Sequence, residues 1–280
     1  MKTEQVIAGL AVQVYTPNPK KRDVHPIPVV LLHGMWVAGW CFQLWIEWFT
    51  TRDYKVYVIN LPGHGGSIAT KPLGKYSVDD FFLSVRDTLV AMGEKRLHFI
   101  GHSTGGLILQ KLLEWQAKEL QDPIITEAVL LMSAPPAFIR LRGKVLWTLL
   151  KLRYLLPILC CGLFKPTKED AIRHVLNYGL EGHRTKIHRK FVDESGRAAR
   201  DIVFWRCKVS GRTIRKSAVR ILIVAGQQDA LVTPEVQFQI FRKYKSPLTT
   251  FLMVKSGHMP MIGGAYTYDI LKGIVSWLYA

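Results

Sequence analysis

A serine between two glycines is the first residue of this chain whose setting suggests chemistry. The segment FIGHSTGG at 99–106 places Ser103 two residues after one glycine and two residues before another, directly behind an apolar run at 97–100. The apolar residues at 107–113 then recur with helical spacing. A serine on such a strand-to-helix turn exposes its hydroxyl at the edge of a sheet. Ser103 is therefore predicted to be a nucleophile, and a glycine-rich turn that ends a strand is the alternative.

A serine hydroxyl needs a base to remove its proton and an acid to orient that base. Of the nine histidines, His258 in SGHMP lies in a loop directly after an apolar strand, where loop residues converge at the carboxyl edge of a sheet. Asp229 ends GQQD and lies just past the preceding strand at 221–225. Asp80 and Asp87 are better explained by helix capping and solvent exposure. The predicted order along the chain is Ser, Asp, His.

The negative oxygen formed by attack on a carbonyl needs backbone N–H donors. The residue after the nucleophile, Thr104, supplies one amide, and the segment HGMW at 33–36 is predicted to supply the second from Met35. Trp36 and His102 adjoin these residues and are the candidate substrate-binding side chains. For His102, a structural role is the alternative.

The elements that position these residues alternate between strands and helices, which is typical of a mostly parallel sheet flanked by helices. The predicted helices begin near Ser77, at Thr233-Pro234 and near residue 270. Strands are predicted at 11–15 (an edge strand), 28–32, 55–59, 97–100, 128–132, 221–225 and 250–254. The fold class is therefore predicted to be α/β.

The alternation of predicted strands and helices is interrupted between residues 135 and 217. Within this interval, residues 138–164 are apolar and helical in pattern, with Arg and Lys among them, and residues 168–216 are polar and basic. This insert (residues 135–217) is predicted to be a helical cap. Residues 1–134 and 218–280 are predicted to form the core around the sheet.

Five short motifs occur in order over almost the whole chain. They are HGMW at 33–36, LPGHGGS at 61–67, GHSTGG at 101–106, GQQD at 226–229 and SGHMP at 256–260. The set resembles the α/β-hydrolase superfamily. The resemblance implies an α/β-hydrolase fold with Ser103 as nucleophile, His258 as base and Asp229 as orienting acid, and it implies no cofactor and no metal. Ser103 argues against the branches that use an aspartate nucleophile.

The charge of the chain is strongly positive and unevenly placed. The chain has 38 Lys and Arg against 21 Asp and Glu, a net charge of +17, and the insert alone carries 19 basic against 6 acidic residues. A basic protein prompts a nucleic-acid hypothesis. Here the positive charge accompanies apolar residues at 138–154, a mixture typical of an interfacial segment, and no nucleic-acid motif is present. We therefore expect no nucleic-acid partner, and contact with a membrane surface through the basic insert is a hypothesis.

The cellular location is predicted from two absences. No apolar secretory signal follows the N-terminal residues, and the apolar run at 155–164 is too short and too interrupted to span a bilayer. The four cysteines show no disulfide framework and no metal-binding spacing. We expect a cytoplasmic protein with a reduced interior that associates with membranes at most peripherally.

The predicted function is hydrolysis of a carboxylic ester, with a lipophilic ester favoured by the apolar insert. Two alternatives stay open. An acyl thioesterase would use the same residues and draw an anionic acyl carrier to the basic insert. A receptor-like member would use the pocket to bind a hydrophobic ligand without catalysis.

Overall fold

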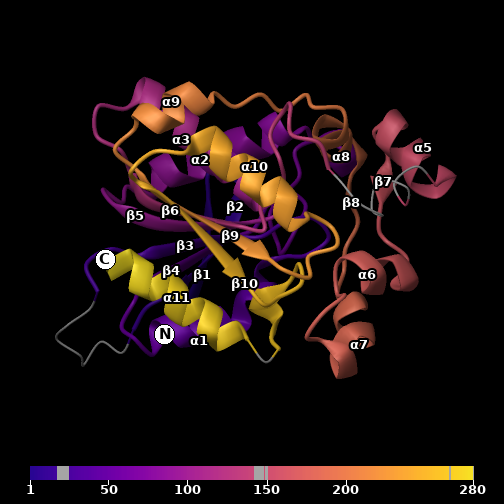
Figure 1. Cartoon of the computed structure of the whole chain (residues 1–280), viewed down its shortest axis with the longest axis horizontal. Coiled ribbons are helices and arrows are strands. Elements are labelled where there is room, and N and C mark those ends of the chain that lie inside the picture. The colour runs from indigo at the N-terminus through magenta and orange to yellow at the C-terminus, as the bar shows by residue number, and fades with distance from the viewer. Residues whose placement is uncertain (18–24, 142–147, 149–150, 265, 280) are drawn as a thin grey trace.

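The computed structural model describes residues 1–17, 25–141, 148, 151–264 and 266–279. Parts of the predicted interfacial segment, residues 142–147 and 149–150, therefore lie outside the described residues. Figure 1 shows a central twisted sheet with helices on both faces, and most of the insert lies at one side.

The sheet has eight strands in the order β1-β2-β4-β3-β5-β6-β9-β10. The pairs β1–β2 and β2–β4 are antiparallel, and all other neighbouring pairs are parallel, which confirms the predicted mostly parallel sheet. The strands are β1 (Lys2–Ile7), β2 (Leu10–Tyr15), β3 (Val29–Leu32), β4 (Val56–Ile59), β5 (Leu97–His102), β6 (Ile125–Leu131), β9 (Arg220–Gly226) and β10 (Thr249–Val254).

The prediction of an edge strand at 11–15 is wrong in one respect, because β1 pairs on the outer side of β2. The side chains of Lys2 to Val6 are all exposed, so the segment KTEQVI shows no alternation of buried and exposed residues that would reveal a strand. By contrast, β3, β4 and β5 are buried along their whole length, as expected for parallel strands covered on both faces.

Helices cover the two faces of the sheet in two groups (Figure 1). Helices α1 (Gln43–Thr50) and α11 (Thr267–Tyr279) pack on one face, and α2 (Val78–Met92), α3 (Thr104–Glu119) and α10 (Pro234–Tyr244) pack on the other. Helix α2 begins as predicted. Ser77 Oγ accepts a hydrogen bond from the amide of Asp80, whose carboxylate accepts one from the amide of Ser77.

The insert consists of short helices and one small antiparallel pair of strands. Its elements are α5 (Leu152–Cys160), β7 (Leu163–Phe164), α6 (Lys168–His174), α7 (Arg184–His188), β8 (Glu194–Ser195), α8 (Gly196–Val203) and α9 (Gly211–Lys216). Helix α8 packs on α2, and α9 packs on α3 and α10. Because α8 and α9 pack directly on helices that cover the sheet, the structure does not separate the insert from the core as a domain. The domain boundaries at residues 134 and 218 therefore stay a prediction.

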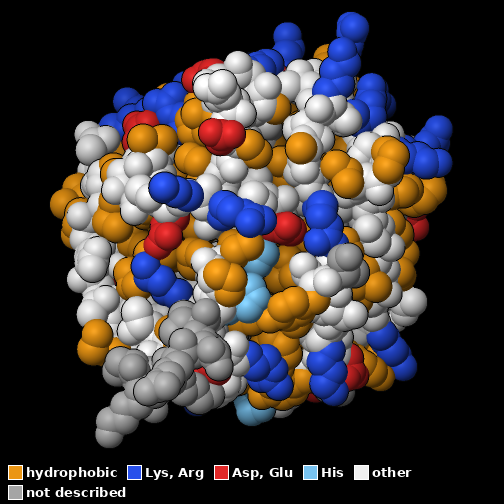
Figure 2. Space-filling view, turned by 90° about the vertical axis from the view of Figure 1, so that its left-hand side faces the viewer, with side chains coloured by type: hydrophobic (Ala, Val, Ile, Leu, Met, Phe, Trp, Pro, Cys, Tyr) orange, Lys and Arg blue, Asp and Glu red, His pale blue; other side chains and the backbone are white. Residues whose placement is uncertain are grey.

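The described helices include none that is long and apolar enough to cross a membrane. Helix α5 instead leaves three leucines in solvent, with Leu152 75%, Leu156 56% and Leu159 47% exposed. Figure 2 shows the face on the left of Figure 1, where acidic and apolar side chains lie between the basic ones and several basic side chains gather toward the upper right. On this face the positive charge forms no continuous stripe.

Candidate active site

The turn between β5 and α3 carries Ser103 in a strained backbone conformation. Its φ is +52° and its ψ is −118°, a region that side chains rarely adopt. Glycines make the turn feasible, because a Cβ at Gly105 would lie 2.5 Å from the carbonyl oxygen of His33, and a Cβ at Gly101 would lie 2.5 Å from that of Gly105. The predicted strand–serine–helix turn is therefore present.

The loops after β9 and β10 bring Asp229 and His258 together. His258 Nδ1 donates a hydrogen bond of 2.8 Å to Asp229 Oδ2, and both side chains are buried. The other carboxylate oxygen of Asp229 accepts hydrogen bonds of 2.9 Å from the amides of Leu231 and Val232. The carboxylate is thus fixed from both sides. It holds His258 with Nε2 as the nitrogen left to act as a base.

Ser103 and His258 are both described in the structure, and Ser103 Oγ forms no hydrogen bond with the imidazole of His258. Such bonds are often long in enzymes without substrate and shorten when substrate binds. The two loops are nevertheless in direct contact, because the ring centroids of His102 and His258 lie 4.8 Å apart.

His102 contacts the loop that carries His258. It is buried, and its Nε2 donates a hydrogen bond of 2.8 Å to the carbonyl oxygen of His258. Burial and the neighbouring His258 hold the pKa of His102 well below its usual value, so this ring is neutral. His102 thus links the turn of Ser103 to the loop of His258, and contact of its side chain with substrate stays a prediction.

A small pocket opens beside Ser103. Its volume is about 60 Å³, and Met35, Trp36 and Thr104 lie in its wall together with Ser103. The rest of the wall is apolar, formed by Ala134, Leu141, Phe164, Ala199, Ile202, Val203, Leu231 and Val232. Five of these apolar residues, Leu141, Phe164, Ala199, Ile202 and Val203, come from the insert and were not recognised from the sequence. Only the packing of the insert over the sheet brings them to Ser103.

The HGMW loop lies directly over the serine. A Cβ at Gly34 would lie 2.7 Å from Ser103 Cβ. His33 stabilises the loop, because its Nδ1 donates to the carbonyl of Gly34 and its Nε2 accepts from the amide of Leu61. Burial and the nearby His64 lower the pKa of His33 to about 3, so this histidine is neutral. The amide of Met35 has no acceptor in the described part of the chain, which leaves it free to bind an oxyanion.

A buried carboxylate of the insert contacts this loop from above. One oxygen of Glu194 accepts a 3.4 Å hydrogen bond from the amide of Trp36 and lies 3.2 Å from His64 Nε2, and both side chains of this ion pair are fully buried. His64 Nδ1 faces the carbonyl of Pro62 at 3.0 Å. Burial opposes the charged ring, but Glu194 outweighs it and raises the pKa of His64. No motif in the sequence pointed to Glu194.

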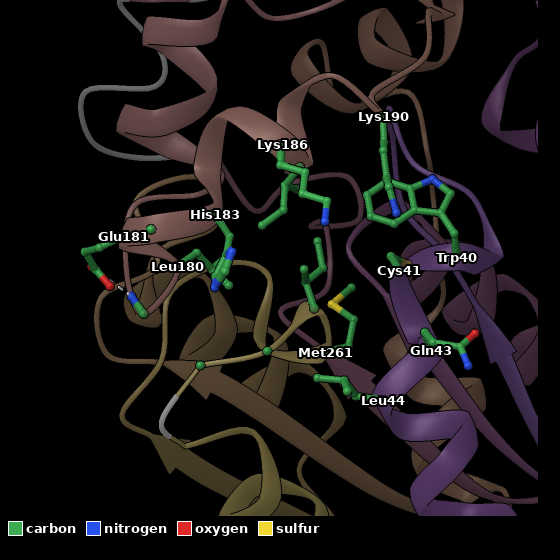
Figure 3. A pocket seen from close by; sticks show the side chains of 16 residues that line it. Trp40, Cys41, Gln43, Leu44, Leu180, Glu181, His183, Lys186, Lys190 and Met261 are labelled. Atoms are coloured by element: carbon green, nitrogen blue, oxygen red, sulfur yellow. Dashed lines mark hydrogen bonds between the residues drawn. The ribbon is translucent and has the colours of Figure 1, made fainter.

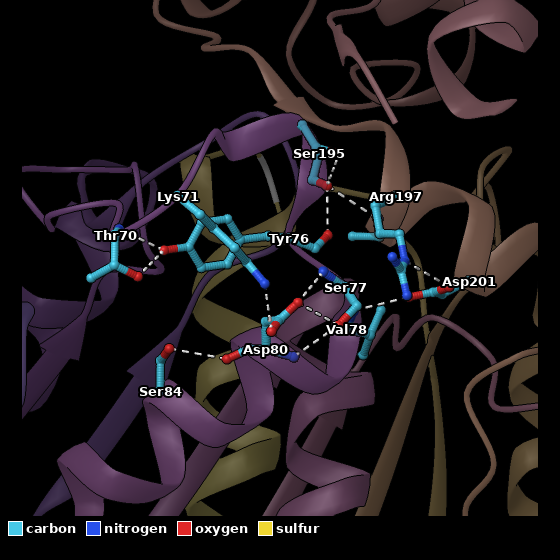
Figure 4. Close-up of polar contacts among 12 residues, drawn as sticks. Thr70, Lys71, Tyr76, Ser77, Val78, Asp80, Ser84, Ser195, Arg197 and Asp201 are labelled. Carbon is cyan, nitrogen blue, oxygen red and sulfur yellow. Dashed lines mark hydrogen bonds and ion pairs between the residues drawn. The ribbon is translucent and has the colours of Figure 1, made fainter. Parts of the chain in front are cut away.

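Further polar contacts fix the insert to the start of α2 (Figure 4). Ser195 Oγ donates hydrogen bonds to the carbonyls of Tyr76 and Gly74, at 2.6 and 3.0 Å. Asp201 accepts a hydrogen bond from the amide of Val78 at 3.3 Å. The insert is therefore held next to the residues that line the pocket.

Comparison with known proteins decides the family. A family model described as "Alpha/beta hydrolase family" matches residues 29–265. The chain belongs to the alpha/beta hydrolase family. This confirms the resemblance seen in the five motifs, and the eight-stranded sheet is the fold of an alpha/beta hydrolase.

Solved alpha/beta hydrolase structures resemble this one over nearly the whole chain. The monoacylglycerol lipase of Paleococcus ferrophilus has a TM-score of 0.70 at 18% identity, covering 96% of this chain and 98% of that one. A thioesterase domain from the curacin biosynthetic pathway has a TM-score of 0.63 at 17% identity, covering 100% and 99%. At these identities the likeness shows the fold alone.

One curated sequence is more similar over a short stretch. The protein named as the carbamate hydrolase RutD of Stutzerimonas stutzeri (strain A1501) is 40% identical to this chain over 58 residues. The match spans 21% of this alpha/beta hydrolase and 22% of that relative. The chain thus matches only about a fifth of the length of the curated relative.

Proposed function

We propose that this alpha/beta hydrolase is a serine hydrolase that cleaves carboxylic esters through an acyl-enzyme, with Ser103, Asp229 and His258 as its catalytic residues. The observation that supports this most strongly is the 2.8 Å hydrogen bond between His258 and Asp229. The loop of His258 contacts His102, the neighbour of a serine in a strained turn. The family and its hydrolase neighbours support the coarser statement that the chain is a hydrolase.

The proposed reaction has two halves. Ser103 Oγ attacks the ester carbonyl carbon while His258 Nε2 takes the hydroxyl proton, and the amides of Met35 and Thr104 bind the oxyanion. The bond to the alcohol oxygen then breaks, and His258 protonates the leaving alcohol. In the second half, His258 takes a proton from water, the resulting hydroxide attacks the acyl carbon, and the carboxylic acid leaves as Ser103 regains its proton.

The apolar wall of the pocket supports a lipophilic substrate. Apart from Ser103 and Thr104, the lining side chains are hydrophobic, with Phe164 and Ile202 contributed by the insert. A volume of about 60 Å³ is far below the ~300–1,000 Å³ of typical ligand pockets. A long acyl chain therefore requires more space than this structure provides, so short esters are the best first substrates.

The experiment that tests this function compares ester and thioester substrates. We expect p-nitrophenyl acetate and butyrate to be hydrolysed, monoacylglycerols to be cleaved more slowly, and Ser103→Ala to lose all three activities. Faster cleavage of acyl-CoAs than of any ester would instead favour the acyl thioesterase. Binding of hydrophobic esters without turnover would favour the receptor-like alternative and contradict the proposal.

We also propose that the insert contacts an anionic membrane surface. Leu152, Leu156 and Leu159 lie along one exposed side of α5, and the exposed Arg153 lies among them. Sedimentation with phosphatidylserine vesicles is expected at low ionic strength, with little recovery at high salt or with neutral vesicles. Equal recovery with neutral and anionic vesicles would contradict this contact.

A further inference from the structure

A second and larger cavity lies between the insert and the core. Its volume is about 560 Å³, within the range of small-molecule sites, and it shares no lining residue with the pocket beside Ser103. Figure 3 shows its wall, which combines the region around α7 with the start of α1 and the turn that follows the His258 loop. Nothing in the proposed hydrolysis uses this cavity.

One side of the cavity is cationic. Figure 3 shows Lys186 and Lys190 extending from the insert into the space beside Trp40. Lys190 Nζ lies 5.1 Å from the centre of the Trp40 ring, a cation–π contact that holds the ammonium at the cavity wall. Neither lysine forms an ion pair with an acidic residue in the described part of the chain. Two positive charges therefore face the cavity without an acidic partner among the described residues.

The lining carries one carboxylate, and it is already engaged. All sixteen lining residues are described, and Glu181 is the acidic one among them. Its Oε1 lies 2.9 Å from Arg184 Nη2 and accepts a hydrogen bond of 3.2 Å from the amide of Gly179. Glu181 therefore does not neutralise the two lysines, and the cavity favours an anion.

The opposite side of the cavity is apolar. Leu44, Leu180, Ile187, Met261 and Ile262 line this side. Met261, Leu180 and Ile187 are buried, so the accessible apolar surface comes from Leu44 and Ile262. A purely hydrophilic anion such as inorganic phosphate would leave this surface uncovered. An apolar chain on the ligand would remove this surface from water, which favours binding.

We propose that this cavity is a binding site for an anionic amphiphile, with its carboxylate or phosphate group against Lys186 and Lys190 and its alkyl chain over Leu44 and Ile262. The two ammonium groups and the apolar side chains line the same cavity, so one ligand can contact both. The site is separate from Ser103, and the proposal does not depend on the hydrolase chemistry. A fatty acid and an alkyl phosphate share this chemistry.

Isothermal titration calorimetry with ten-carbon probes below their micelle concentrations tests the site. Decanoate and decyl phosphate are expected to bind the full-length protein with one site each, and the tighter of the two identifies the preferred head group. Decanol and inorganic phosphate each lack half of the chemistry and are expected to bind at least tenfold more weakly. Equal binding of decanol would contradict the role of the lysines.

Lysine-to-glutamine variants test whether decanoate binds in this cavity. Lys186→Gln combined with Lys190→Gln should weaken decanoate binding at least tenfold, because the charge-assisted contacts to the head group are removed. A matched control, Lys208→Gln with Lys245→Gln, makes the same charge change at exposed lysines elsewhere and should leave the affinity unchanged. Equal weakening in both double variants would show general attraction to a basic protein and overturn the proposal, as would no weakening in either.

Discussion

Replacing Asp229 by Asn is expected to lower kcat for a soluble ester by about 10⁴ while the fold is retained. The reason lies in the hydrogen bonds of the native carboxylate. Its Oδ1 accepts from the amides of Leu231 and Val232, and its Oδ2 accepts from His258. An asparagine has one oxygen, which the two amides will take. Its NH₂ group then faces His258 Nδ1, so the ring proton moves to Nε2 and the base is lost.

The measurement is the hydrolysis rate of p-nitrophenyl butyrate, with circular dichroism and thermal unfolding to show that the variant is folded. Asp87→Asn is the matched control, because Asp87 is exposed on α2 and its ion pair among the described residues is with its neighbour Arg86. This control should retain full activity. A turnover by Asp229→Asn within tenfold of the wild type would mean that another group orients His258.

Replacing Glu194 by Gln is expected to lower the free energy of unfolding by about 3–5 kcal/mol, the usual effect of removing one partner of a buried ion pair. The remaining His64 would be left in a site with no exposed surface and no carboxylate. The amide of Trp36, next to the proposed oxyanion donor Met35, would also lose its charged acceptor. We therefore expect a lower kcat for esters as well as lower stability.

The loss of stability should depend on pH. Glu194 raises the pKa of His64 in the folded protein, so the stabilisation is complete below the unfolded value of about 6.5 and disappears as the pH rises through the folded value. The difference in unfolding free energy between wild type and Glu194→Gln should therefore be larger at pH 6 than at pH 9. Urea unfolding at the two pH values measures it.

Two further variants separate the ion pair from general effects of the substitution. Glu169→Gln removes an exposed carboxylate from the same insert and should change stability by less than about 0.5 kcal/mol at either pH. The double variant His64→Gln with Glu194→Gln removes both charges and should be less destabilised than the sum of the two single variants. Additive effects would show that the two residues do not act as a pair.

The residues of the proposed triad could be found from the sequence because each has a local signature. Ser103 follows a buried strand and precedes a helix, and Asp229 and His258 follow the last two strands. Since β9 and β10 are parallel neighbours, their carboxyl ends meet at one edge of the sheet, and the contact between Asp229 and His258 follows from the topology. Such predictions need only the order of the strands.

Other features depend on packing between distant segments and have no local signature. Glu194 lies 158 residues from Trp36 in an insert without regular alternation, so its burial beside His64 could not be predicted. The hydrogen bond of His102 to the carbonyl of a residue 156 positions away could not be predicted for the same reason. The cavity around Lys186 likewise exists only once the insert packs on the core.

The most direct measurement of the central claim is the intact mass of the protein after reaction with a fluorophosphonate, followed by peptide mapping. An activated serine should gain one phosphonyl group, with fluoride leaving, and the modified peptide should contain Ser103. Asp229→Asn should react much more slowly, and Ser103→Ala should not react. Undiminished labelling of Ser103→Ala, or a wild-type protein that stays unmodified, would contradict the assignment of Ser103 as the nucleophile.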